Sequence, residues 1–452
     1  MNANIFKAYD IRGKYPADLN EKVAELVGKA IASLFIKKYH KSNPLVLVGK
    51  DVRNTSEVLE KALIKGLVSQ GADVLRVGLC TTPYLYFLMN KIKPDGGVAV
   101  TASHNPKEYG GFKIRGKGNE SVDERTGLLD IKKMVLSGEF KKSVSIGKIK
   151  DCQDFKKEYI KFLSSSINIK KNISLVVDNG GGSTALFLPE LLSKFPKLKY
   201  KPLFFKIDGS FTKHSPNPLL AESQQFAKKE LAKGGANFGI IFDGDGDRVI
   251  FLDEKGEMIK TEFILGLYAE KQTEKGIKTS VVMPVNTSRG VREHLEKSGV
   301  KVHLIRVGYT FVQQALKKSE ISLGAEISGH LYFKDFFNID SGLRALLKLS
   351  AIVAEAKEPL SRLVSKFETY INSGEMNFEV ADKKKVLAAV KRKYKDAKIS
   401  TLDGVTVEYP DWWFNVRPSN TEPLIRVVME ARDKKTLEEK NKELVETIKK
   451  YL

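Results

Sequence analysis

Up to about residue 364, short apolar runs alternate with amphipathic stretches. Apolar runs recur at Leu45–Val48, Ser174–Val177, Phe238–Phe242 and Ser280–Met283, and stretches with helical periodicity, such as 56–70, lie between them. Each run has the length and the β-branched content of a buried strand. A chain of alternating strands and helices indicates mostly parallel sheets with helices on both faces.

This strand–helix pattern occurs three times, which indicates a weak internal triplication. The three copies end in the polar segments Thr101–Pro106, Asp243–Arg248 and Glu326–His330, and a short strand near Ile321–Leu323 precedes the last of them. Ligands of open α/β sheets bind beyond the carboxyl ends of the strands. Three loops at strand ends are therefore predicted to serve one site.

The pattern changes after about Val364. Strands are predicted at 376–380, 401–407, 412–416 and 424–429, and helices at 382–395 and 435–452. This order is typical of a smaller α+β domain with an antiparallel sheet. The fold class is therefore α/β: three similar α/β domains with mixed, mostly parallel sheets, plus a C-terminal α+β domain. The predicted boundaries are 1–149, 150–250, 251–364 and 365–452.

Composition agrees with a multidomain globular protein. The chain has 452 residues, 42% of them apolar and 29% charged. A chain of this length is too long for one core. The first residues lack the apolar core of a secretory signal, and no apolar run is long enough to span a bilayer. With only Cys80 and Cys152, a disulfide framework is not expected, and we expect a cytoplasmic protein.

The net charge of +21 raises the question of nucleic-acid binding. The lysine pairs are scattered, and no zinc-finger spacing or aromatic RNA-binding motif accompanies them. We therefore expect no specific nucleic-acid partner, although a basic nucleic-acid-binding protein stays open as the non-enzymatic alternative. A positive field also favours an anionic substrate.

The segment Asp243-Gly-Asp-Gly-Asp-Arg248 carries the most chemical information. In an extended segment, alternate side chains face one side, so Asp243, Asp245 and Asp247 converge. Three converging carboxylates suit a hard divalent cation, and Arg248 offers a planar donor for phosphate. A helix–loop–helix calcium site needs Gly at the sixth position, which is Arg248 here. A solvated acidic turn is the other alternative.

Thr101–Pro106 places the hydroxyl of Ser103 beside the imidazole of His104, and Lys113 follows. A Ser-His hydrolase is conceivable. However, the side chains of adjacent residues normally diverge, and the chain lacks the G-x-S-x-G elbow. Beside a divalent cation, Ser103 is better suited to accept and donate a phosphoryl group, with Mg²⁺ as the natural ion. A plain polar turn is the alternative.

Three further segments have compositions that suit ligand binding. Glu326 and Ser328 alternate in the loop that ends at His330, and could bind sugar hydroxyls. Arg417-Pro-Ser-Asn-Thr421 has the composition of a phosphate cradle. Near the amino terminus, Arg12 in Tyr9-Asp-Ile-Arg-Gly13 could neutralise a transferring phosphoryl group. Each of these segments is also compatible with an ordinary turn, a helix cap or a surface ion pair.

Taken together, these motifs resemble the α-D-phosphohexomutase family. The resemblance covers essentially the whole chain, with the motifs in the order and roughly the spacing of that family. It implies four domains around a deep central cleft and a resting enzyme phosphorylated on Ser103. It also implies one Mg²⁺ per chain, held by Asp243, Asp245, Asp247 and the phosphate on Ser103.

The implied reaction interconverts a hexose 1-phosphate and a hexose 6-phosphate. Phosphoserine donates to the free hydroxyl, and hexose 1,6-bisphosphate, the intermediate and activator, turns over before Ser103 takes back the other phosphoryl group. The resemblance assigns catalytic roles to Ser103, His104, Arg12, Lys113, Arg248 and His330. It assigns substrate binding to Tyr9, Glu326, Ser328, Arg306, Tyr309, Arg417, Ser419, Asn420 and Thr421.

Within the family, Tyr9–Arg12 and Glu326–His330 look most like the phosphomannomutase/phosphoglucomutase branch. Tyr309 stands where that branch often has His, which leaves the choice between mannose and glucose open. A phosphoglucosamine mutase and a metal-dependent sugar phosphatase are the enzymatic alternatives. We expect a phosphosugar as the partner, no membrane, and a monomer, with a dimer as the alternative.

Overall fold

The computed structural model describes residues 1–140, 145–318, 320–419 and 424–451. They form two compact units. Unit 1 contains Met1–Met258, Gly329–Leu331 and Asp335–Leu360, and unit 2 contains Ile259–Ser328, Tyr332–Lys334 and Ser361–Leu452. Within the described ranges, no helix combines the length and the apolar character that crossing a membrane requires.

The first sheet of unit 1 is mixed, with the order β1-β5-β4-β2-β3-β7 and β6 paired to β5. β2 is parallel to β3 and β4, whereas β5 is antiparallel to β1 and β4. Its strands are β1 (Ile11–Lys14), β2 (Leu45–Lys50), β3 (Asp73–Leu79), β4 (Gly96–Val100), β5 (Tyr109–Gly116), β6 (Glu120–Ser121) and β7 (Ile149–Asp151). The helices of this region are α1 (Glu21–Tyr39), α2 (Asn54–Ser69), α3 (Thr82–Ile92) and α4 (Leu128–Ser137).

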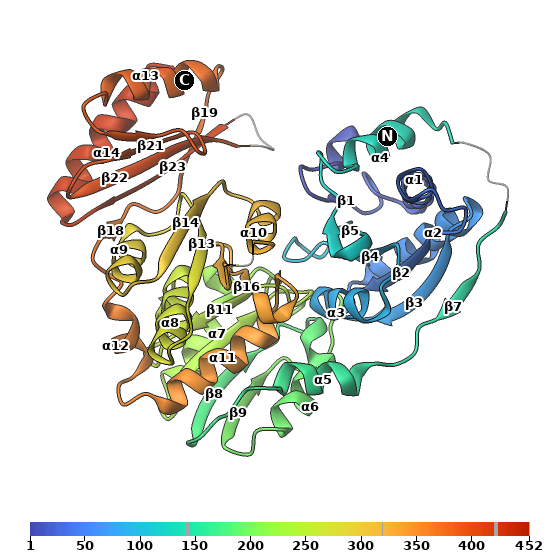
Figure 1. The fold of residues 1–452 in the computed structure, drawn as a ribbon, viewed down its shortest axis with the longest axis horizontal. Helices are drawn as coiled ribbons and strands as arrows, with labels where there is room; N and C mark the ends of the chain where they lie inside the picture. The colour runs from blue at the N-terminus through green and yellow to red at the C-terminus, as the bar shows by residue number, and fades with distance from the viewer. Residues whose placement is uncertain (141–144, 319, 420–423, 452) are drawn as a thin grey trace. The chain divides into compact units, whose positions relative to one another are not determined.

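Helices cover both faces of this sheet (Figure 1). A Cβ built on Gly96 would meet Phe35 of α1, and one built on the next residue, Gly97, would meet Met89 of α3. Because neighbouring residues of a strand face opposite sides, α1 and α3 pack on opposite faces. The three-layer arrangement predicted from the alternating pattern is confirmed for this sheet.

The second sheet of unit 1 has the order β12-β11-β10-β8-β9. β8 is parallel to β9 and β10, and β10 and β11 form an antiparallel hairpin around the aspartate segment. Its strands are β8 (Ile173–Asp178), β9 (Leu198–Leu203), β10 (Phe238–Phe242), β11 (Val249–Leu252) and β12 (Met258–Ile259). Unit 1 also contains β17 (Ile339–Asp340) and the helices α5 (Lys156–Ser164), α6 (Leu188–Ser193), α7 (Ala221–Leu231) and α11 (Gly342–Glu355).

Unit 2 begins with a third sheet in which β13 is parallel to β14 and β15. The part of this sheet that belongs to unit 2 runs in the order β14 (Lys301–Ile305), β13 (Ser280–Pro284), β15 (Leu323–Ala325) and β16 (Leu331–Phe333). The helices are α8 (Thr261–Glu274), α9 (Arg289–Lys297), α10 (Tyr309–Leu316) and α12 (Leu360–Ser365). The strand predicted near Ile321–Leu323 starts later, because Ile321 donates its N–H to Lys318 O and pairing with β13 begins at Leu323.

A fourth sheet, also in unit 2, is antiparallel, with the order β18-β23-β22-β21-β20 and β19 paired to β23. It contains β18 (Ile371–Asn372), β19 (Met376–Glu379), β20 (Lys398–Ser400), β21 (Val405–Glu408), β22 (Trp412–Pro418) and β23 (Leu424–Ala431). The helices α13 (Lys383–Lys393) and α14 (Lys434–Lys449) contact it. This arrangement confirms the predicted α+β class of the C-terminal region.

The α1–α2 contact requires two glycines. A Cβ on Gly28 of α1 would overlap Leu63 O, and one on Gly66 of α2 would overlap Glu25 O. The two helix backbones therefore approach more closely than any side chain at these positions would allow. In a helix interior, Gly is otherwise about 1 kcal/mol less favourable than Ala. The close contact between the helices is therefore the reason that Gly is favoured at these two positions.

We expect Gly66→Ala to lower the free energy of unfolding by about 1–3 kcal/mol, because the added methyl group forces the helices apart. Lys22→Ala, an exposed position of α1, is the control and should change it little. Urea unfolding followed by circular dichroism measures both. Gly66→Ala as stable as the parent protein would contradict the close packing.

Candidate active site

Polar side chains collect at the carboxyl ends of the parallel strands of unit 1. Asp51 follows β2 directly, and the Ser103 loop follows β4, whose last residue pairs with Lys50 in parallel register. Asp243 follows β10 in the second sheet. The structure brings the loops of the two sheets together, because Ser103 contacts Asp243.

Ser103 is fully buried, and its Oγ donates a hydrogen bond to Asp243 Oδ2 at 2.7 Å. Its backbone lies in the left-handed region, with φ of 52°. His104 Nδ1 lies 3.4 Å from Ser103 Oγ. The expectation that these adjacent side chains diverge is therefore wrong, and the positive φ of Ser103 accounts for the difference because it turns the loop sharply between them.

Asp243, Asp245 and Asp247 are all buried, with at most 3% of each exposed. One carboxylate oxygen from each lies within 4.8 Å of the others. Asp243 Oδ1 accepts hydrogen bonds from the N–H groups of Gly246 (2.9 Å) and Arg248 (3.2 Å). In contrast, Oδ1 of Asp245 and Oδ1 of Asp247 are buried and accept no hydrogen bond from the described residues. Unpaired buried carboxylate oxygens are costly, and a cation that they ligate would remove this cost.

Lys113 supplies positive charge to this cluster from β5. Its Nζ donates to Asp245 Oδ2 at 2.8 Å and forms an ion pair with Asp247 Oδ2. Burial would lower the pKa of Lys113, but the Asp245 and Asp247 carboxylates outweigh it and hold that pKa well above its usual range. The ammonium group is therefore charged at any physiological pH.

The three carboxyl groups have different surroundings. Burial raises the pKa of Asp243 well above its usual range, and the charges of Asp245 and Asp247 raise it further. Burial also raises the pKa of Asp247, but Lys113 and His330 outweigh it, and the result is well below the usual range. Asp245 lies at the amino terminus of α3, where Thr82 donates its N–H to Asp245 O (3.0 Å) and its hydroxyl to Oδ2 (2.5 Å).

Arg12, which is cationic, and His104 complete this group. Arg12 forms an ion pair with Asp10 at 2.8 Å and donates to Ala102 O, next to Ser103, at 3.2 Å. Burial, followed by the positive charges of Arg248 and Arg12, holds the pKa of His104 well below its usual range. His104 is therefore a neutral imidazole beside the Ser103 hydroxyl and can accept a proton.

Arg53 is a residue that the sequence analysis did not single out. Its buried guanidinium donates to four carbonyl oxygens of the Ser103 loop: Ser103 O (2.7 Å), Asn105 O (2.5 Å), Pro106 O (2.7 Å) and Tyr109 O (3.3 Å). Asp51 accepts from Arg53 Nε at 3.1 Å and from Thr101 Oγ1 at 2.6 Å. The sequence feature that could have indicated its importance is Asp51-Val-Arg53, a charged pair directly after a predicted strand.

His330 lies in unit 1, next to the aspartate segment. Its backbone forms a β-bridge with Arg248, and its Nε2 lies 3.5 Å from Asp247 Oδ1 and 3.7 Å from Asp340 Oδ2. Asp340 was also missed by the sequence analysis. Arg248 is half-buried, and its Nε donates no hydrogen bond within the described part of the chain.

The remaining predicted residues are distributed over both units. Tyr9 is half-buried in unit 1. In unit 2, Glu326 follows β15 and accepts a hydrogen bond from Tyr332 Oη at 2.6 Å, and the half-buried Ser328 lies in the same loop. Arg306 follows β14, with its guanidinium 5.1 Å from the ring centre of Phe311.

The other predicted substrate residues also belong to unit 2. Tyr309 begins α10. Arg417 forms an ion pair with Glu375 at 2.9 Å, and Ser419 donates its N–H to Leu424 O. The predicted residues Asn420 and Thr421 lie outside the described residues.

Four domain models of one family match the chain. They are described as phosphoglucomutase/phosphomannomutase alpha/beta/alpha domains I (residues 3–141), II (157–256) and III (260–370) and the C-terminal domain (375–447).

The chain belongs to the phosphoglucomutase/phosphomannomutase family. Among its relatives, the phosphomannomutase of Vibrio cholerae serotype O1 is 34% identical over 98% of both chains. That of Methanocaldococcus jannaschii is 35% identical over 99% of this chain and 98% of its own. A phosphoglucomutase/phosphomannomutase family protein from Burkholderia thailandensis has a similar crystal structure, with a TM-score of 0.90, 28% identity, and coverage of 99% of this chain and 98% of its own.

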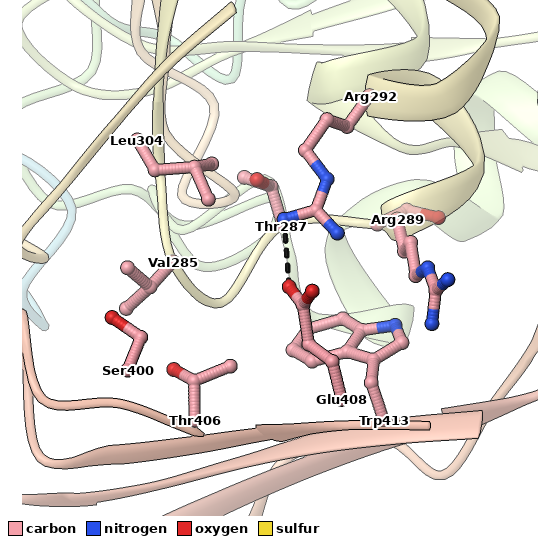
Figure 2. Close-up of a pocket in the computed structure, with 10 residues that line it drawn as sticks. Val285, Thr287, Arg289, Arg292, Leu304, Ser400, Thr406, Glu408 and Trp413 are labelled. Carbon is pink, nitrogen blue, oxygen red and sulfur yellow. Dashed lines mark ion pairs between the residues drawn. The ribbon is translucent and has the colours of Figure 1, made fainter. Parts of the chain in front are cut away.

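Unit 2 of this chain also contains a pocket that is separate from the predicted site residues. It is lined by side chains of the segment between β13 and α9, of α9, of β14 and of the fourth sheet, including Thr287, Thr406 and Trp413, and by the ion pair of Arg292 with Glu408 at 2.8 Å (Figure 2). Its volume is about 30 Å³, room for about two water molecules. None of the predicted site residues lines it.

We expect Arg53→Met to destabilise unit 1 by about 3–5 kcal/mol, because Asp51 would lose the partner of its buried charge. The Ser103–Tyr109 amides should also exchange hydrogen faster. Arg76→Met is the control: Arg76 is half exposed and pairs with an exposed aspartate, and such pairs contribute at most about 1 kcal/mol. Thermal unfolding and hydrogen exchange measure both variants. Equal effects would show that Arg53 does not hold the loop.

Proposed function

We propose that the chain is a Mg²⁺-dependent phosphohexomutase that interconverts hexose 1-phosphates and hexose 6-phosphates. The reaction would proceed through phosphorylated Ser103 and a hexose 1,6-bisphosphate, which also serves as activator. The observation that supports this most directly is the hydrogen bond from the buried Ser103 Oγ to Asp243 within a cluster of three buried carboxylates. A hydroxyl at a cluster of this kind is suited to carry a phosphoryl group next to a cation.

The residues fit a magnesium ion. The donor set is oxygen only, which Mg²⁺ prefers, and two of its carboxylate oxygens are buried without a hydrogen-bond partner among the described residues. We propose that Asp243, Asp245, Asp247 and the phosphate on Ser103 hold one ion. When bound, it would neutralise negative charge on the phosphoryl group and polarise it toward attack.

Phosphoryl transfer would break the bond between Ser103 Oγ and phosphorus and form a bond from phosphorus to a sugar hydroxyl oxygen. Positioning and charge neutralisation supply most of the rate in such reactions. Arg12, Lys113 and Arg248 would neutralise the phosphoryl oxygens, and the buried Nε of Arg248 is available for this. In the reverse direction Ser103 gives up its proton, and the neutral His104, 3.4 Å from Oγ, is placed to accept it.

The other roles are proposed from the resemblance. His330 would assist proton transfer at the sugar hydroxyl, Glu326 and Ser328 would bind sugar hydroxyls, and Tyr9, Arg306 and Tyr309 would contact the substrate. Arg417, Ser419, Asn420 and Thr421 would hold the phosphate that does not react. The pairing of Arg417 with Glu375 at 2.9 Å implies that this carboxylate is exchanged for phosphate on binding.

For the substrate we propose mannose phosphates, glucose phosphates or both. Relatives named phosphomannomutase, at 34% and 35% identity over nearly the full chain, support this choice. Glucosamine 1-phosphate is the competing substrate in a coupled assay, and release of inorganic phosphate is the signature of a sugar phosphatase. We propose a cytoplasmic monomer, with a dimer as the alternative; the thiols of Cys80 and Cys152 are free, as a reducing compartment requires.

We propose domain boundaries near 149/150, 250/251 and 364/365. The matches of the four family models support one domain per segment. β11 (Val249–Leu252) and α12 (Leu360–Ser365) span two of these positions. The connections that separate the domains there would lie a few residues toward the carboxyl terminus.

With glucose 1-phosphate and mannose 1-phosphate, the purified protein should form the 6-phosphates without steady release of inorganic phosphate. Ser103→Ala should lose essentially all turnover, because no oxygen remains to carry the phosphoryl group. Intact-mass spectrometry should find one phosphate on the parent protein and none on the variant. Ser137→Ala, at an exposed position at the end of α4, is the matched control. Normal turnover by Ser103→Ala would exclude the proposed donor.

Asp245→Asn should weaken Mg²⁺ dependence, since one charged ligand becomes a neutral amide. We expect the Mg²⁺ concentration for half-maximal activity to rise at least about tenfold, the scale reported for perturbing metal sites. A Mg²⁺ titration of activity after treatment with a chelator measures it, with Asp396→Asn as a control in unit 2. An unchanged titration curve would count against the metal site.

A further inference from the structure

A second group of potential ligands lies on the other side of Asp247. Asp247, His330 and Asp340 are each at least 90% buried, and one ligand atom from each lies within 4.8 Å of the others. The two oxygens of Asp247 face different partners. Oδ2 pairs with Lys113, whereas Oδ1 lies 3.5 Å from His330 Nε2. Asp247 therefore belongs to two clusters, and only the first contains Ser103.

The spacing of the second cluster is compatible with metal ligation. His330 Nε2 lies 3.5 Å from Asp247 Oδ1 and 3.7 Å from Asp340 Oδ2. Hydrogen bonds of this type are about 2.7–3.2 Å long, so both separations are long for them. Ligands at about 2.0–2.1 Å from a tetrahedral Zn²⁺ are themselves about 3.3–3.4 Å apart. A shift of a few tenths of an ångström would bring His330 Nε2 to that spacing from each of the two oxygens, and the ligand atoms of all three residues already lie within 4.8 Å of one another.

Two unpaired oxygens provide an independent observation. Oδ1 of Asp247 and Oδ1 of Asp340 are buried and accept no hydrogen bond from the described part of the chain. Two carboxylates that are only 3% and 4% exposed and lie near the same imidazole nitrogen leave negative charge that a divalent cation would neutralise.

The cluster is also held in place by backbone contacts, as a metal site requires. Val249 donates its N–H to Gly329 O at 3.0 Å, and His330 forms a β-bridge with Arg248. On the other side, Ser341 donates its N–H to Leu331 O at 3.2 Å. The backbones on both sides of His330 and next to Asp340 are therefore tied together.

We propose that Asp247, His330 and Asp340 form a second cation site, selective for imidazole-binding transition ions such as Zn²⁺. Imidazole is a common ligand of Zn²⁺, whereas Mg²⁺ is bound almost entirely through oxygen. The two sites share Asp247, so their occupation is antagonistic. Zn²⁺ would draw Asp247 away from the first site and His330 away from the sugar hydroxyl, and so inhibit the enzyme; this consequence rests on the proposed mutase function, whereas binding itself does not.

Zn²⁺ binding is measured by competition with a chromophoric chelator, first without Mg²⁺ and then with Mg²⁺, which should weaken it because the two sites share Asp247. The parent protein should bind one Zn²⁺, and Asp340→Asn and His330→Gln should each bind it at least about tenfold more weakly, the scale of perturbed metal sites. Asp245→Asn, which removes a ligand of the first site only, should still bind it. Asp151→Asn, an equal charge change at a side chain that is 74% exposed, is the control.

Unchanged Zn²⁺ affinity in Asp340→Asn, or loss of Zn²⁺ binding in Asp245→Asn, would overturn the proposal, because Zn²⁺ would then occupy the first site alone. Circular dichroism establishes that each variant is folded, and His330→Gln decides the question if Asp340→Asn is not. In the mutase assay, Zn²⁺ should inhibit the parent protein at lower concentrations than Asp340→Asn. A protein without mutase activity would refute the proposed function and leave the binding result intact.

Discussion

The buried negative charge at the carboxyl end of β10 is the constraint on which the site in unit 1 depends. Asp243, Asp245 and Asp247 are at most 3% exposed. Two unit charges 4 Å apart repel by about 4 kcal/mol at an effective dielectric constant of 20, which is comparable with the net stability of a domain. Such a cluster persists only where other groups neutralise it. The surrounding groups meet this requirement through their charge or through a hydrogen bond.

Those groups come from separate parts of the fold. Lys113 reaches the cluster from β5, and Thr82 meets Asp245 from the amino terminus of α3, the end of the helix that favours negative charge. The Ser103 hydroxyl donates to Asp243 from the loop after β4. Parallel strands make this possible, because their carboxyl ends meet at one edge of a sheet. The loops of the first and second sheets then share the charge between them.

Glycines allow the aspartate segment and the Ser103 loop to approach each other closely. A Cβ on Gly244 would lie 2.8 Å from Ser103 O, so any side chain there would displace the serine loop. Gly246 has φ of 76°, a conformation that favours glycine. Alternation of Asp and Gly was therefore informative in the sequence: the acids indicated a cation, and the glycines indicated that another backbone lies against them.

The parts of this site that the sequence predicted are those encoded locally. β10 was predicted at its observed bounds, because Phe238–Phe242 is an uninterrupted apolar run that ends at an acidic segment. The class of all four sheets was likewise readable from the spacing of apolar runs. Arg53 and Asp340 were missed because their importance is not local. Arg53 donates to carbonyl groups about 50 positions away. Every residue has a backbone carbonyl group, so the residue types along the sequence do not indicate these contacts.

The side-chain geometry of Ser103 and His104 is a second feature that the sequence alone did not predict. Neighbouring side chains diverge in regular structure, but the φ of 52° at Ser103 places Nδ1 of the next residue 3.4 Å from its hydroxyl. That φ is imposed by the loop, whose carbonyl groups are held by Arg53. A buried guanidinium with four acceptors thus maintains a backbone conformation that serine alone would rarely adopt. The reactive geometry of Ser103 therefore depends on Arg53, which lies outside the segments that the sequence analysis singled out.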